Sequence, residues 1–228
     1  ALEVGAGSGV LTEALAQRVD RVLATDFSPA MIKLLESRMH EIGATNVACQ
    51  VMDGQALALA DASFDVVASS FALMLFPDRA RGFAEMSRVL RPGGRAMVSV
   101  WDAPERLEAL GILLQAVRKA FPELPPPPAP LPIFSLADPL QFRAEMEESG
   151  FTEVEIASTA RELSVPDFDQ LWGMLTVGAP PVRILFDQVG EGGKQRLRDA
   201  LAELVEQRYG TGEIRTVNTA LVATAVVA

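Results

Sequence analysis

Segments with the pattern of buried β-strands alternate with segments with the pattern of amphipathic helices over the first hundred residues. Short apolar runs bounded by glycine, proline or polar residues predict strands, whereas apolar residues spaced by three and four predict helices. Strands are expected at residues 2–4, 21–25, 47–52, 64–69 and 96–101, and helices at 10–18, from Ser28 through Met39, and at 78–90. This alternation favours a largely parallel sheet with helices on both of its faces.

The pattern changes after residue 101. Further helices are expected at 104–121, 138–149 and within 165–209, strands at 151–157 and 213–227, and a stiff extended connector at the prolines from Pro125 to Pro132. The prediction is a Rossmann-like, doubly wound α/β fold with seven strands, mostly parallel with an antiparallel last strand, plus helical cap insertions. Residues 1–228 are expected to form one domain, divided into a core (1–102), a helix and connector (103–134), a helix and strand six (135–160), a helical insertion (161–212) and the last strand (213–228). Because the chain starts without Met inside a predicted strand, a segment is expected to precede Ala1.

A glycine-rich turn, Glu3-Val4-Gly5-Ala6-Gly7-Ser8-Gly9, follows the first predicted strand. Glycines let the backbone turn sharply and approach a ligand closely, and the helix that follows favours an anionic group. A dinucleotide fingerprint would place its third glycine at position 10, where Val10 stands, and no Gly-Lys-Ser/Thr triplet indicates a phosphate loop. The acid two residues before the first glycine, with glycine at every second position, instead resembles the first motif of class I S-adenosylmethionine (SAM)-dependent methyltransferases.

Asp26 ends the second predicted strand, about twenty residues after the glycines. A carboxylate at this place can accept hydrogen bonds from both hydroxyls of a ribose. The alternative role, capping the next helix, already falls to Ser28. Phe27 and Met31 are candidates to cover an adenine face, although Met31 also has the spacing of a core residue.

The resemblance implies further cofactor contacts after the third and fourth strands. Met52, Asp53 and Gly54 follow the third strand, where the family's acid accepts a proton from the adenine amino group and a glycine permits close approach; a solvated loop acid is the alternative. Ser69, Ser70 and Phe71 fall where the family contacts the amino-acid end or the sulfonium. Leu90-Arg91-Pro92-Gly93-Gly94 is similar to the structural turn before strand five. The resemblance covers residues 1 to about 160 and is closest to the branch of ubiquinone and menaquinone biosynthesis methyltransferases, often called type 11.

No catalytic base stands out. His40, the only histidine, is expected near the end of the second helix and exposed to solvent. Several relatives carry histidine where this chain has Met74 or Leu75, which puts a histidine-based mechanism in doubt. The absence of a candidate base favours methyl acceptors that react without one, such as an acidic phenol, an enolic carbon, a carboxylate or a thiol. Trp101 and Asp102, at the end of strand five, are candidates for substrate contact.

The overall charge argues against nucleic acid as a partner. The chain has 30 acidic and 20 basic residues, a formal net charge of -10, whereas nucleic-acid binding depends on Lys and Arg. No apolar run reaches the roughly 18 residues of a membrane span. A single cysteine, Cys49, fits a reducing compartment, and a cytoplasmic location is expected. No metal site is predicted, and a homodimer is compatible with the sequence.

The leading hypothesis is a SAM-dependent methyltransferase that acts on a small organic molecule, apolar or aromatic by family analogy, and releases S-adenosylhomocysteine. The acceptor atom stays open among O, C, N and S. One alternative is a SAM-binding protein without transferase activity, which would retain the same motifs. Another is a nicotinamide-dependent oxidoreductase, which the glycine spacing disfavours. Whether the helices at 103–121 and 165–209 enclose substrate or only pack on the sheet stays open.

Overall fold

The structure is a computed structural model that describes residues 1–125, 131–177 and 180–228. Most of the predicted proline connector, from Pro126 to Pro130, lies outside the described residues. The chain divides into two compact units, one of residues 1–102, 132–159 and 220–228, and the other of 103–131 and 160–219. The prediction of a single domain with inserted segments stays a prediction.

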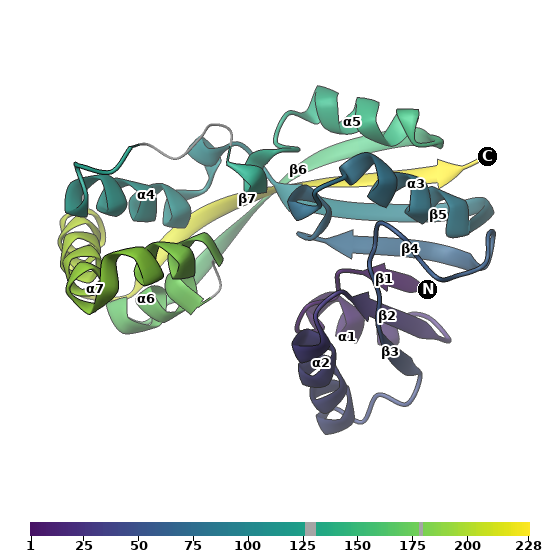
Figure 1. The fold of residues 1–228 in the computed structure, drawn as a ribbon, viewed down its shortest axis with the longest axis horizontal. Coiled ribbons are helices and arrows are strands. Elements are labelled where there is room, and N and C mark those ends of the chain that lie inside the picture. The colour runs from purple at the N-terminus through teal and green to yellow at the C-terminus, as the bar shows by residue number, and fades with distance from the viewer. Residues whose placement is uncertain (126–130, 178–179) are drawn as a thin grey trace. The chain divides into compact units, whose positions relative to one another are not determined.

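The described residues form a seven-stranded sheet with the order β3-β2-β1-β4-β5-β7-β6 (Figure 1). The strands are β1 (Leu2–Val4), β2 (Val22–Asp26), β3 (Val47–Val51), β4 (Phe64–Ser70), β5 (Leu90–Trp101), β6 (Phe151–Val165) and β7 (Ile214–Val227). Pairs among β1 to β5 are parallel, and β7 runs antiparallel to β5. The predicted doubly wound fold with an antiparallel last strand is therefore confirmed. The chain leaves β1 toward β2 and β3 on one side and continues through β4 and β5 on the other, so the strand order reverses between β1 and β4.

Helices cover both faces of the sheet in the first unit (Figure 1). They are α1 (Val10–Ala16), α2 (Pro29–Glu41), α3 (Arg79–Val89) and α5 (Pro139–Glu148), with short 3-10 turns η1 (Leu73–Leu75) and η3 (Pro132–Phe134). On β2, Leu23 packs against the cluster that includes α3 and α5, while its neighbours Val22 and Ala24 pack against α2. Successive strand residues point to opposite faces, so the two helix pairs lie on opposite sides of the sheet.

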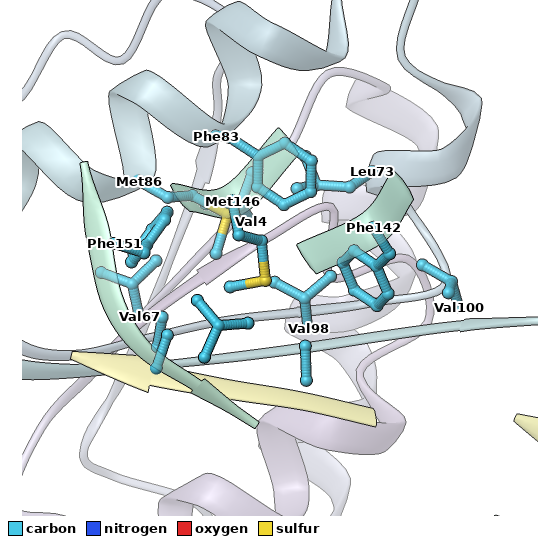
Figure 2. Packing of buried hydrophobic residues seen from close by; sticks show 14 of the residues in the cluster. Val4, Val67, Leu73, Phe83, Met86, Val98, Val100, Phe142, Met146 and Phe151 are labelled. Atoms are coloured by element: carbon cyan, nitrogen blue, oxygen red, sulfur yellow. The ribbon is translucent and has the colours of Figure 1, made fainter. Parts of the chain in front are cut away.

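The larger core joins α3 and α5 to the central strands. Figure 2 shows Phe83 and Met86 of α3 with Phe142 and Met146 of α5 over the strand residues. The strand side of this cluster is supplied by Val4, Val67, Val98, Val100 and Phe151. All of these side chains are at most 2% exposed. This buried apolar cluster fixes the positions of the carboxyl ends of β1, β4 and β5 relative to one another.

Two details of the helices and strands differ from the prediction. In α2 the buried stripe is Ile32, Leu35 and Met39, whereas Met31 and Leu34 are 40% and 51% exposed. Met31, which has the spacing of a core residue, therefore lies on the exposed face of the helix. The turn predicted before strand five is instead part of β5, since the register shifts from Leu90 opposite Phe64 to Arg95 opposite Val66. A bulge at this place takes up the extra residues of the Pro-Gly-Gly segment.

The second unit is a small helical assembly with its own core. It contains η2 (Pro104–Arg106), α4 (Glu108–Ala120), α6 (Phe168–Val177) and α7 (Pro180–Tyr209), which has a non-helical residue at Gly190. Its core is formed by Ile112, Leu113, Leu171, Leu197 and Leu201, among others. The expectation of two or three helices over 165–209 is confirmed. No helix in the described ranges is both long and apolar enough to cross a bilayer.

Candidate functional site

The glycine loop follows β1 at the carboxyl edge of the sheet, where the strand order reverses. Gly5, Gly7 and Gly9 all have positive φ, at 73°, 54° and 86°, a region that L side chains rarely adopt. A Cβ on Gly5 would lie 2.3 Å from the Cβ of Ala72, and a Cβ on Gly9 would lie 2.3 Å from Leu35. Nothing lies within 4 Å of the corresponding point at Gly7. Gly5 and Gly9 thus serve internal packing, and Gly7 presents the open part of the loop.

Asp26, at the end of β2, is tied directly to this loop. Its two carboxylate oxygens accept hydrogen bonds from the backbone N–H groups of Gly7 and Ser28, each at 2.9 Å. Ala6, also predicted in the site, is buried and donates its N–H to the carbonyl of Thr25 at 2.8 Å. A carboxylate has about four acceptor positions, so Asp26 keeps capacity for further donors. Ser28, rather than Asp26, caps α2, by accepting from the N–H of Met31.

Two apolar side chains that follow Asp26 closely in the chain are exposed to solvent. Phe27, the next residue, is 78% exposed, and Met31, on the first turn of α2, is 40% exposed. The core role considered for Met31 is therefore excluded. Exposed apolar side chains beside a polar anchor suit the flat face of a base.

Glu3 is placed differently from the rest of the predicted site. It is 1% exposed, and its carboxylate accepts a hydrogen bond of 2.5 Å from the hydroxyl of Thr12 on α1. Burial raises the pKa of Glu3 to about 7, with a smaller upward contribution from the charge of Asp26, while the bond from Thr12 acts in the opposite direction. In this structure the side chain joins β1 to α1 inside the protein, and its direct contact with a cofactor stays a prediction. Thr12 could not be assigned to this site from sequence, because its contact with Glu3 depends on the packing of α1 against β1.

The segment after β3 brings a second acid to the same edge. Met52 donates its N–H to the carbonyl of Asp26 at 3.0 Å, which places Asp53 next to the end of β2. The Asp53 side chain is exposed, and bonds from the backbone and side chain of Gln55 lower its pKa. At Gly54 a Cβ would lie 2.6 Å from Val4 and 2.7 Å from Phe76, so this glycine is required for packing.

The serines at the end of β4 face opposite sides of the sheet. Ser69 is fully buried, and its hydroxyl has no partner among the described residues. The hydroxyl of Ser70 lies 2.9 Å from that of Ser99, its register partner on β5. Only Ser70 is partly open, so it is the better placed of the two for a ligand contact. Sequence alone could not pair it with Ser99, because that pairing depends on strand register.

An aromatic pair follows the ends of β4 and β5. Phe71 has a φ of 55°, which is rare for an aromatic residue, and its N–H donates to the carbonyl of Ser99. Its ring centroid lies 4.2 Å from that of Trp101, with the planes tilted by 31°. Asp102, the other residue predicted to contact substrate, is 5% exposed and accepts a bond from Ser158 at 3.1 Å. Phe71 and Trp101 therefore form the partly open apolar surface at this edge.

The structure places no histidine at this edge. His40 is exposed near the end of α2, as predicted. Met74 is 3% exposed in η1, while Leu75 is 49% exposed, and neither can take up a proton. No group of three or more His, Cys, Asp or Glu side chains within the described ranges could hold a metal ion.

A sheet of this order, with a glycine loop after β1 and carboxylates after β2 and β3, defines a Rossmann-like α/β fold of the kind that binds nucleotide cofactors at the carboxyl ends of its strands. Residues 2–98 match the family model described as "Methyltransferase domain". Residues 2–98 are therefore similar to the methyltransferase domain of class I SAM-dependent methyltransferases, and the curated relatives over this part include enzymes of the type 11 branch.

Curated relatives of this chain are named as methyltransferases, and solved structures share its fold. The chain is 29% identical to methyltransferase ktnA of Aspergillus niger over 187 residues, which cover 71% of this chain and 60% of that protein. It is 37% identical to a demethylmenaquinone methyltransferase of Corynebacterium kroppenstedtii over 103 residues, 45% of this chain and 42% of that protein. YcgJ from Bacillus subtilis is similar in fold, with a TM-score of 0.58 at 18% identity over 99% of this chain and 90% of that structure. The chain spans 60% or less of the length of the two curated relatives.

The residues present fit SAM. Gly7 leaves open space at the loop, Asp26 has unused acceptor positions, and the exposed Phe27 and Met31 lie beside it. Asp53 supplies a second acceptor at the end of β3. These features are those that a nucleoside with two ribose hydroxyls and an exocyclic amino group requires.

Proposed function

We propose that this protein transfers a methyl group from SAM to a small organic acceptor. The observation that carries the proposal is the carboxylate of Asp26, held by the N–H groups of Gly7 and Ser28 where the strand order reverses. Its orientation is fixed before any ligand arrives, so binding a ribose requires little additional ordering of this side chain.

The cofactor would lie along the ends of the first four strands. Asp26 accepts from the ribose hydroxyls, Asp53 accepts from the adenine amino group, and Phe27 and Met31 cover the base. The glycine loop and Ser70 are assigned to the amino-acid end. Support comes from the exposure of Asp53, Phe27 and Met31, and from the bond between Met52 and Asp26, which keeps the two acids adjacent.

The acceptor would lie against the ring pair of Phe71 and Trp101. When bound, the cofactor supplies an electrophilic methyl group, and the protein's part is to hold the acceptor atom in line with it. A planar apolar or aromatic molecule matches this surface, whereas neither Met74 nor Leu75 offers a base. The proposed acceptors are therefore those already acidic or nucleophilic: a phenol, an enolic carbon, a carboxylate or a thiol. The net charge of -10 also favours a small molecule over nucleic acid, and a cytoplasmic location stays a prediction.

Calorimetric titration with S-adenosylhomocysteine tests the cofactor site, with NADH titrated in parallel. Asp26→Ala should abolish binding because the ribose loses its acceptor, while Asp20→Ala, the same change at an exposed position, should leave it intact. Binding of NADH in place of S-adenosylhomocysteine would contradict the proposal. Binding without methyl transfer to any phenol, enol, carboxylate or thiol of a broad panel would favour a SAM-binding protein without transferase activity.

A further inference from the structure

We propose that Gln55 is a positioning residue, which orients the carboxylate of Asp53 so that one oxygen faces the amino group of the cofactor's base. The inference rests on the proposed function, because it concerns how the same site recognises the adenine base.

Gln55 makes three hydrogen bonds to two neighbours. Its backbone N–H and its side-chain Nε2 both donate to Oδ1 of Asp53, at 2.9 and 3.1 Å. Its Oε1 accepts from the backbone N–H of Asp78 at 2.8 Å. One side chain thus links the acid after β3 to the residue that caps α3.

The partners determine which way the amide of Gln55 points. The N–H of Asp78 requires an acceptor, which in the Gln55 amide is the oxygen. The carboxylate of Asp53 requires a donor, which is the amide nitrogen. A glutamine satisfies both at once, since one end of its amide accepts and the other donates. A glutamate at this position would keep the bond from Asp78 but would set a second negative charge beside Asp53.

These bonds leave one face of Asp53 open. Both donors go to Oδ1, and Oδ2 has no partner within the described part of the chain. The same two bonds lower the pKa of Asp53, which keeps it an ionised acceptor at neutral pH. The free oxygen is the one available to an exocyclic amino group.

Helix α3 holds the rest of this loop as well. Glu85 accepts the N–H of Leu57 at 2.6 Å, and Arg88 donates to the carbonyls of Leu57 and Leu59 at 3.0 and 2.8 Å. By contrast β3 is an edge strand, and β2 is its one partner among the described strands. The Asp53 carboxylate is therefore held from α3, through the side chain of Gln55, as well as from β2, through the bond between Met52 and Asp26.

The test compares two ligands by calorimetry: S-adenosylhomocysteine and its analogue with hydrogen in place of the 6-amino group. The ratio of their affinities isolates the contact to the amino group from the rest of binding. Asp53→Ala should bring the ratio to about one. Gln55→Met and Gln55→Glu should each lower it by roughly three- to tenfold, the range expected when a hydrogen bond to a charged group is misaligned but not removed. Affinity for the analogue itself should change little.

Two controls separate positioning from general damage. Gln55→Glu retains the bond from Asp78, so its melting temperature should remain near that of the wild type while its ratio falls. Asp78→Ala removes the bond to the N–H of Arg81 and loosens the cap, but leaves its own N–H for Gln55, so its ratio should be unchanged.

The outcomes distinguish this inference from the function on which it rests. A wild-type protein that does not bind S-adenosylhomocysteine would overturn both. An unchanged ratio in Asp53→Ala, with binding intact, would leave the function and overturn the reading of adenine by Asp53, and with it the inference. A collapsed ratio in Asp53→Ala together with a wild-type ratio in both Gln55 variants would overturn the inference alone.

Discussion

Replacing Glu3 by glutamine should raise the free energy of unfolding at alkaline pH. The gain should be much smaller at acidic pH. The buried carboxyl has a pKa of about 7 in the folded chain, against 4.5 as its ordinary value. At about 1.4 kcal/mol per pKa unit, the ionised side chain costs the folded state roughly 3 kcal/mol above pH 7. Because the folded state binds this proton more tightly, its stability falls as pH rises from about 4.5 through 7.

Urea denaturation of the wild type and Glu3→Gln at pH 5, 6.5 and 8 measures this effect. The difference in the free energy of unfolding should grow by about 2.5 kcal/mol across the series, because glutamine has no proton to lose. Thr12→Val provides a control of opposite sign, since the hydroxyl lowers the pKa of Glu3. Without it, the pKa of Glu3 in the folded state rises further, so the decline in stability should extend to higher pH and become larger. A difference between wild type and Glu3→Gln that stays constant with pH would refute the reasoning.

Four other changes test the packing around the site, three by thermal or urea denaturation and one by limited proteolysis. Gly5→Ala should cost several kcal/mol, since its Cβ would lie 2.3 Å from that of Ala72, while Gly7→Ala should cost only about 1 kcal/mol of backbone strain; equal losses would contradict the packing role. Ser69→Ala should be neutral or stabilising by up to about 1 kcal/mol, because the buried hydroxyl has no described partner; a clear loss would reveal one. Arg88→Met should free residues 57–59 for proteolysis before global unfolding; unchanged cleavage would contradict its anchoring role.

Much of the fold could be predicted because local pattern decides it. Strand segments ended by glycine or acid, alternating with helical spacing, favour a parallel sheet, and the ends of parallel strands must meet at one edge. Asp26 could therefore be placed at the site from its position alone. The limits of β5 could not be predicted in this way. Residues 91–94 have turn composition, yet they lie in the strand, because a bulge forms where β5 pairs with β4.

The sequence by itself determined the sheet, the glycine loop and the acids that follow β2 and β3, since these depend on short-range spacing. Only the tertiary structure decided which of the candidate side chains are open. Glu3 is sealed beneath α1, Ser69 points into the interior while Ser70 pairs with Ser99, and Met31 lies on the exposed face of α2. Gln55 could be assigned to the site only from the structure, in which the backbone N–H of Asp78 at the start of α3 lies 2.8 Å from its Oε1. Exposure and hydrogen-bond partners depend on residues distant in the chain, which packing alone brings together.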